Sequence, residues 1–67
     1  MEYTFPGFPN IAVSPGICAG KPHVRGTRIT ISAILAHLAG GMRIESMLQE
    51  FPRLKQEDIF AALAFAA

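Results

Sequence analysis

Apolar residues from position 31 onward recur with the spacing of a helix. The first set occupies positions i, i+3, i+4 and i+7 and consists of Ile31, Ile34, Leu35 and Leu38. Thr30 or Ser32 can cap the start of this segment, and the Gly40-Gly41 pair can end it. The pattern therefore predicts a first helix that begins near residue 31 and ends at the two glycines.

The helical spacing continues toward the C-terminus. In the second segment it is kept by Ile44, Met47, Leu48 and Phe51. Pro52 ends that segment, because the residue before a proline disfavours helical geometry. A third helix is predicted from about Lys55 to the C-terminus, with Ile59, Leu63 and Ala66 facing inward. Three helices joined by tight turns predict a tri-helical body of helix-turn-helix type.

The chain before residue 31 has the composition of short strands and turns. Residues 1–10 contain two prolines and a glycine, which disfavour helices and central strands, so we expect an N-terminal arm that lies on a surface. Ile11-Ala12-Val13 is a strand candidate, closed by the turn residues Ser14-Pro15-Gly16. We therefore expect a mostly α-helical chain of α+β type, with the arm at residues 1–10 and one domain at residues 11–67.

Gly26-Thr27 lies between two short runs with β character, His23-Val24-Arg25 and Arg28-Ile29-Thr30. A glycine in the first position of a two-residue connection favours a type II′ hairpin, because the backbone there needs a positive φ. Such a hairpin would bring Arg25 and Arg28 side by side at its base. One local structure would then present two guanidinium groups.

A chain of 67 residues is short for an independent core. At this length folding buries only about 60% of the surface that the unfolded chain exposes, so stability is marginal. Cys18 is the only cysteine, and no Cys/His cluster has the spacing of a zinc site. The segment from Ile59 to Ala67 lacks any polar side chain, and as a lone surface helix it would expose an apolar surface that favours association. Association, with a homodimer as the simplest form, is therefore expected.

The formal net charge of +1 conceals an uneven distribution. Residues 1–30 carry three basic side chains against Glu2 alone, whereas residues 31–67 carry one more acidic than basic side chain. The slightly acidic helical part argues against helices that hold a phosphate backbone unaided.

The sequence contains no recognisable catalytic or metal-binding pattern. His23 and His37 lack a third ligand, and no serine or threonine is paired with a histidine and an acid in a nucleophile arrangement. Gly20-Lys21 is followed by Pro22, which removes an amide that a phosphate-cradling loop needs. Neither a secretory signal nor an apolar run of about 20 residues is evident. We expect a cytoplasmic protein that is not an enzyme and uses no cofactor or metal.

The order of glycines, prolines and charged residues resembles that of one known family. The matching segments are Ser14-Pro15-Gly16-Ile17-Cys18-Ala19-Gly20-Lys21-Pro22, Arg25-Gly26-Thr27-Arg28-Ile29, Gly41-Met42, Phe51-Pro52-Arg53-Leu54, Glu57-Asp58-Ile59 and Ala62-Leu63. Over nearly all of residues 11–67 the chain resembles the domain-of-unknown-function-433 family. The resemblance implies a small bacterial or archaeal protein with a helix-turn-helix-like fold, similar to VapB-type antitoxins that are encoded beside a PIN-like ribonuclease toxin. No catalytic residues come with it.

Two positions depart from the family pattern. Members commonly have Ser or Thr just before the second and third helices, where this chain has Arg43 and Lys55. Loss of such a cap costs about 0.5–2 kcal/mol, and a cation at a helix N-terminus is mildly unfavourable as well. Both helices are therefore expected to fray unless an anion or a partner compensates.

Two groups of residues are candidates for binding anions. Lys21, Arg25 and Arg28 could contact DNA phosphates or the metal-binding carboxylates of a PIN-like nuclease, because arginine bonds two oxygens at once. The alternative is that Arg28 pairs with Glu57 or Asp58 and that Lys21 is simply solvated. The second group lies where a helix-turn-helix protein touches the DNA backbone and consists of Arg43, Arg53, Lys55 and Gln56. Base reading by the third helix is disfavoured, because its outward positions hold an acid, alanines and phenylalanines.

Three apolar residues of the third helix, Phe60, Leu63 and Phe65, are candidates for a dimer or partner interface. Phe60 and Phe65 cannot both share the inward face with Ile59 and Leu63, so at least one ring is expected at the surface. Aromatic anchors on small apolar helices are typical interface cores. The alternative is that residues 3–8 cover them.

These observations lead to one functional hypothesis and two alternatives. The first is an antitoxin-like binding protein that occupies a PIN-like toxin, with Arg25 or Arg28 against acidic groups and Phe60, Leu63 and Phe65 as apolar anchors. The second is a DNA-binding transcriptional regulator, a role that can coexist with the first. The third is a purely structural oligomerisation module.

Overall fold

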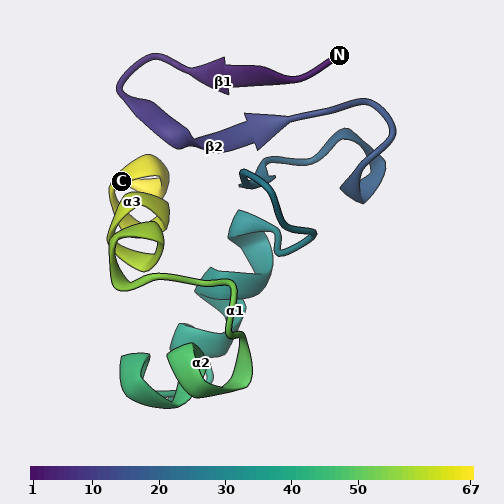
Figure 1. Ribbon diagram of the computed structural model, residues 1–67. Coiled ribbons are helices and arrows are strands. Elements are labelled where there is room, and N and C mark those ends of the chain that lie inside the picture. Colours follow the sequence, from purple (N-terminus) through teal and green to yellow (C-terminus); the bar gives the residue numbers. More distant parts are fainter.

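The computed structural model describes residues 1–67, in which a small antiparallel sheet lies against three helices (Figure 1). Strands β1, β2 and β3 span Tyr3–Phe5, Phe8–Val13 and His23–Val24 and pair in the order β1-β2-β3. Helices α1, α2 and α3 span Ile31–Ala39, Ile44–Glu50 and Gln56–Ala66. The chain is therefore an α+β domain, which confirms the class expected from the sequence. None of its helices is long and apolar enough to cross a membrane.

Residues 1–10 enter the sheet, and residues 8–10 belong to its central strand β2, so the expectation that their composition disfavours a central strand is wrong. β1 pairs antiparallel with β2, and the register shifts after Thr4. Pro9 lies within this shift, where no residue of β1 faces it, so its missing N–H leaves no gap in the ladder. Gly7 makes the turn between the strands with a φ of +82°. Pro9 and Gly7 therefore lie where the hairpin tolerates or needs them.

The core lies where the sheet meets the helices. Eight buried apolar side chains form one cluster: Ile11, Val24, Ile31, Ile34, Met47, Leu54, Ile59 and Ala62. They come from β2, β3, all three helices and the connection between α2 and α3. Figure 1 shows α3 beside β2 at the sheet, with α1 and α2 farther from it. Because one cluster joins these elements, it also holds the loops between them in fixed positions.

The helix boundaries match those expected from the sequence. α1 begins after Thr30, whose Oγ1 accepts a hydrogen bond from the amide of Ala33 at 3.0 Å. Thr30 is therefore the cap, and Ser32 is not. α1 ends at Gly40, and α2 ends just before Phe51.

The two helices with unusual N-caps are stabilised differently at their starts. Arg43 and Lys55 precede α2 and α3, and neither side chain accepts a capping hydrogen bond. At α3, however, Asp58 Oδ2 accepts a hydrogen bond from the amide of Lys55 at 3.0 Å. This contact supplies one half of a capping box and offsets part of the predicted deficit at α3. α2 has no comparable contact from its own third residue.

The inward face of α3 is rotated from the predicted one. Ile59 is buried as expected, but Leu63 and Ala66 are exposed, so the prediction is wrong for these two residues. Ala62 and the half-buried Phe65 take their places. The reason is that α3 packs against the hairpin of residues 3–13 as well as against α1 and α2, and the hairpin was not foreseen.

Candidate binding surface

The loop between β3 and α1 is built around a turn at residues 24–27. The amide of Thr27 donates to the carbonyl oxygen of Val24 at 3.0 Å, so Arg25 and Gly26 are the central residues. Gly26 has a φ of +80°, which a type II turn requires at its third position. The predicted type II′ hairpin with Gly26 as the first central residue is therefore wrong.

Side-chain hydrogen bonds hold this loop from within and from outside. Thr27 Oγ1 donates to the carbonyl oxygen of Val24 at 2.8 Å and accepts from the amide of Ile29 at 3.0 Å. Cys18 Sγ donates to the carbonyl oxygen of Arg28 at 3.3 Å. The loop is thus fixed on both sides of its tip, so the side chains at the tip project from a braced backbone.

Arg25 and Arg28 lie in different environments. Arg25 Nε contacts Glu2 Oε1 at 3.2 Å, and both side chains remain exposed. Arg28 forms no salt bridge. The alternative in which Arg28 pairs with Glu57 or Asp58 is therefore wrong, and Asp58 accepts a hydrogen bond from Asn10 Nδ2. One of the two loop arginines is therefore free to bind an external anion.

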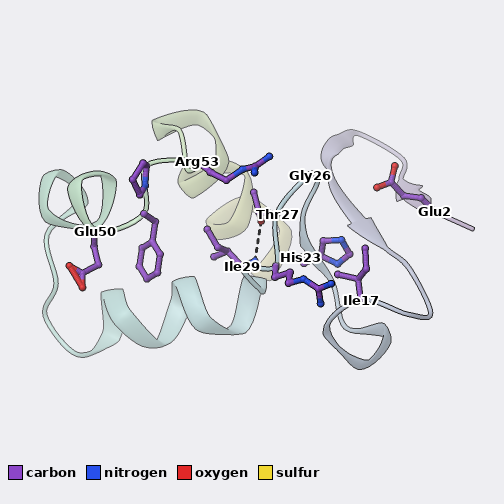
Figure 2. A pocket seen from close by; sticks show the side chains of 11 residues that line it. Glu2, Ile17, His23, Gly26, Thr27, Ile29, Glu50 and Arg53 are labelled. Atoms are coloured by element: carbon purple, nitrogen blue, oxygen red, sulfur yellow. Dashed lines mark hydrogen bonds between the residues drawn. The ribbon is translucent and has the colours of Figure 1, made fainter.

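A hollow of about 660 Å³ opens between this loop and the α2–α3 connection (Figure 2). Arg28 and Arg53 both line it, and we call it the arginine hollow. Its apolar lining comes from Ile17, Ile29 and Phe51. The fold thus places two cations, one from each candidate anion-binding group, around one apolar hollow.

Titratable groups other than the arginines also line this hollow. Figure 2 shows Glu2 and Glu50 on opposite sides of it, with Arg53 and Thr27 between them. His23 is only 1% exposed, and its Nδ1 lies 3.1 Å from the carbonyl oxygen of Lys21, to which it donates. The hollow therefore has acidic ends, and its middle carries a cation.

A second hollow, of about 440 Å³, lies at the start of α3. Arg25, Arg53 and Lys55 line it together with Glu57 and Asp58. Arg53 borders both hollows, which makes it the residue that connects the two candidate anion-binding groups. Three cations and two carboxylates share this surface.

The remaining predicted residues lie elsewhere. Arg43 and Gln56 line a third hollow of about 650 Å³, whose apolar lining includes Met42 and Leu48. Lys21 is exposed and lines none of the hollows. The apolar lining that Phe51 adds next to Arg53 was not predicted from the sequence, although Phe51-Pro52-Arg53 belongs to one of the segments that resemble the family.

The three apolar candidates on α3 divide into two kinds. Phe65 is half-buried and packs edge-to-face on Phe5 and Phe8, with ring centroids 4.8 and 5.4 Å away. The N-terminal hairpin therefore covers Phe65. Phe60 and Leu63 stay 51% and 43% exposed on the outer side of the helix. Of the three candidates these two are the exposed ones, and we call the pair the Phe60 patch.

Comparison with known proteins places this architecture in a family. Residues 11–66 match the model of the family described as protein of unknown function (DUF433). The uncharacterized protein y4eO of Sinorhizobium fredii is 39% identical over 56 residues, which are 84% of this chain and 25% of that protein. This chain therefore spans about a quarter of the length of that relative.

A solved structure shares the same fold. The crystal structure of a DUF433 member protein from Anabaena variabilis superimposes with a TM-score of 0.80 at 32% sequence identity. The match covers 84% of this chain and 55% of the Anabaena chain. The chain belongs to the DUF433 family.

Proposed function

We propose that the protein is an antitoxin-like binding protein that occupies a PIN-like ribonuclease toxin and blocks its activity. The observation that carries this proposal is the Phe60 patch, which consists of two large apolar side chains that this small domain leaves exposed. The class of partner is the one that the resemblance to VapB-type antitoxins implies. The protein would bind this partner in the cytoplasm of a bacterium.

The chemistry of the outer side of α3 supports a protein partner. Phe60 and Leu63 are three positions apart, so they lie on neighbouring turns of the same face. No charged or polar side chain occurs from Ile59 to Ala67, so no charged side chain of this segment must be desolvated when this part of the helix is covered. Burying aromatic and aliphatic anchors of this kind supplies most of the energy of many interfaces. The same patch could also join two copies of the chain in a homodimer.

The loop arginines supply the polar part of the proposed interface. Arg28 has no acidic partner within the chain, so it can bind a carboxylate of the nuclease without first losing one. Arg25 is held by Glu2, but an exposed pair of this kind is worth only about 0–1 kcal/mol. Arg25 can therefore exchange Glu2 for an acidic group of the partner at little cost.

Co-expression tests the proposal directly. A PIN-like ribonuclease encoded beside this gene should arrest growth when expressed alone, and the present protein should restore growth and co-elute with the nuclease. The double variant Phe60→Ser, Leu63→Ser should lose both effects while keeping its circular dichroism spectrum, because both side chains are exposed. Ala36→Ser, an exposed position on α1 and outside this surface, is the control and should behave as the wild type. Continued toxicity with the wild-type protein present would contradict the proposal.

DNA binding by a helix-turn-helix formed by α2 and α3 is the second candidate function. The observation that favours it is the gathering of Arg25, Arg53 and Lys55 around the hollow at the start of α3. Glu57 in the same hollow and the apolar outer side of the helix oppose it. Any contact would therefore be to phosphates rather than to bases.

Salt dependence distinguishes this second candidate from the first. Binding to a duplex of the gene's own promoter should weaken steeply as the salt concentration rises. The logarithm of the association constant should fall with the logarithm of the salt concentration, with a slope of about −0.9 per phosphate contacted. Arg53→Gln should reduce that slope by about one unit, measured by fluorescence anisotropy. A complex whose affinity is insensitive to salt and is lost in Phe60→Ser would instead favour a protein partner.

A further inference from the structure

The arginine hollow is lined by two arginines, neither of which forms a salt bridge within the chain. Arg28 and Arg53 line it, and the salt bridge of the chain joins Arg25 to Glu2. Both free arginines are exposed and come from segments far apart in the sequence. Guanidinium groups form their strongest hydrogen bonds with carboxylates and phosphates, because two parallel N–H groups match two oxygens. The pair therefore indicates an anionic ligand.

The lining between the arginines indicates that the ligand is also apolar. Ile17, Ile29 and Phe51 are half-buried and line the hollow, and the latter two also pack on the core. The volume of about 660 Å³ falls within the range of about 300–1,000 Å³ that is typical of ligand sites. A free phosphate or sulfate would leave this apolar lining without a contact.

The walls of the hollow are braced before any ligand binds. On one side, Thr27 is hydrogen-bonded to Val24 and Ile29. On the other side, the Phe51 ring packs on His37 with a centroid distance of 5.5 Å, and the amide of Phe51 donates to the carbonyl oxygen of Met47. A preformed site loses little entropy on binding, which favours recognition of a short segment.

The acids at the ends of the hollow decide between the two main kinds of anionic ligand. Glu2 and Glu50 flank it on opposite sides (Figure 2). A chain of phosphates running through the hollow would meet a carboxylate at both ends, which is unfavourable. A peptide has separated charges, so it can place one carboxylate near Arg28 or Arg53 and neutral backbone near the two acids.

We propose that the arginine hollow binds a short acidic segment of a partner protein, in which an aliphatic side chain packs on Ile29 and Phe51 while a neighbouring carboxylate binds Arg28 or Arg53. This inference rests on the proposed function, because it names the part of the protein partner that this surface holds. In that complex the arginine hollow holds the acidic segment, and the Phe60 patch makes a separate apolar contact.

A peptide titration tests the inference without the nuclease. The probe is an acetylated and amidated hexapeptide of alternating aspartate and leucine, added to the isotope-labelled full chain and followed by proton–nitrogen NMR. Saturable shifts are expected at the amides of Gly26, Thr27 and Ile29. Arg28→Gln and Arg53→Gln should each weaken binding about two- to fivefold, as expected for one exposed ion pair. Arg43→Gln removes a cation that does not line this hollow and is the matched control.

Three results would overturn the inference. The first is equal binding of the same peptide with asparagine in place of aspartate, because the arginines would then not bind the carboxylates of the peptide. The second is saturable binding of adenosine monophosphate at these amides without binding of the peptide, which would make the hollow a nucleotide site. The third is no shift with either probe. If no peptide binds but the nuclease complex still forms through Phe60, the proposed function stands and the role of the hollow is wrong. If the peptide binds but no nuclease complex forms, the hollow binds acidic peptides and the proposed function is wrong.

Discussion

Asn10 Nδ2 donates a hydrogen bond to Asp58 Oδ1 at 3.0 Å and so ties β2 to the first turn of α3 across 48 positions of the chain. The other oxygen of the same carboxylate accepts from the amide of Lys55. Asp58 is buried, and both of its contacts come from within the chain. One side chain therefore sets both the start of α3 and the position of that helix against the sheet. The surface that carries Arg53 and Lys55 depends on it.

Replacing Asp58 should destabilise the fold more than replacing any other acid of the chain. Asp58→Ala removes two partly buried hydrogen bonds to a charged group and leaves Asn10 Nδ2 and the Lys55 amide without this acceptor, so the free energy of unfolding should fall by about 2–4 kcal/mol. Urea denaturation followed by circular dichroism measures this loss. Glu57→Ala is the control, because Glu57 is exposed in the same turn and should change stability by less than about 0.5 kcal/mol. Equal effects of the two substitutions would show that the carboxylate does not anchor α3.

Gly26→Ala should destabilise the protein by about 1 kcal/mol, because an L-residue is strained at the φ of +80° that the turn requires. An added Cβ would meet no atom within 4 Å, so the cost is conformational and not steric. Gly16→Ala is the matched control: its surroundings are equally open and its φ is not in the left-handed region. It should be neutral or stabilising by about 0.4–1 kcal/mol. The two melting temperatures should therefore move in opposite directions or differ clearly, and indistinguishable shifts would argue against the observed turn.

Phe65→Ala should cost about 2–4 kcal/mol of stability, whereas Phe60→Ala should cost less than about 0.5 kcal/mol. The difference arises because Phe65 packs on the rings of Phe5 and Phe8, while Phe60 faces solvent. Thermal unfolding of the two variants measures it. A comparable loss in both would mean that the N-terminal hairpin does not cover α3 or that the Phe60 patch is buried in the isolated protein.

Thr30→Ala should lower stability by about 1 kcal/mol, because Thr30 Oγ1 caps the amide of Ala33 at the start of α1. Ser32→Ala is the control and should be neutral or slightly stabilising, since Ser32 is exposed within the helix and alanine is the better helix former. Chemical denaturation of both variants decides which residue is the cap. The reverse order would place the helix start two residues later.

The three helices could be predicted from the sequence because their apolar spacing and their stop signals are local. Ile31, Ile34 and Leu38 repeat with the helical period, and Gly40 and Pro52 mark ends that depend on neighbouring residues alone. The N-terminal hairpin could not be predicted in the same way. Pro6 lies in the turn between β1 and β2, and Pro9 is compatible with a strand only through the register shift, which depends on how β1 pairs.

The face of α3 and the composition of the candidate site depend on contacts between distant parts of the chain. Asp58 is buried because Asn10 lies opposite it, and no local pattern around residue 58 indicates this partner. Likewise, Arg28 and Arg53 were assigned to separate groups, and only the packing of the β3–α1 loop against the α2–α3 connection brings them to one hollow. The residue types at the surface could be predicted from the sequence, but their grouping could not.

Titration of a PIN-like ribonuclease with this protein tests the central claim most directly. Cleavage of a fluorescent RNA substrate should fall with each addition and reach the baseline at a fixed molar ratio, and the Phe60→Ser, Leu63→Ser variant should leave the cleavage rate unchanged. A nuclease that remains fully active in a large excess of the folded wild-type protein would contradict the account.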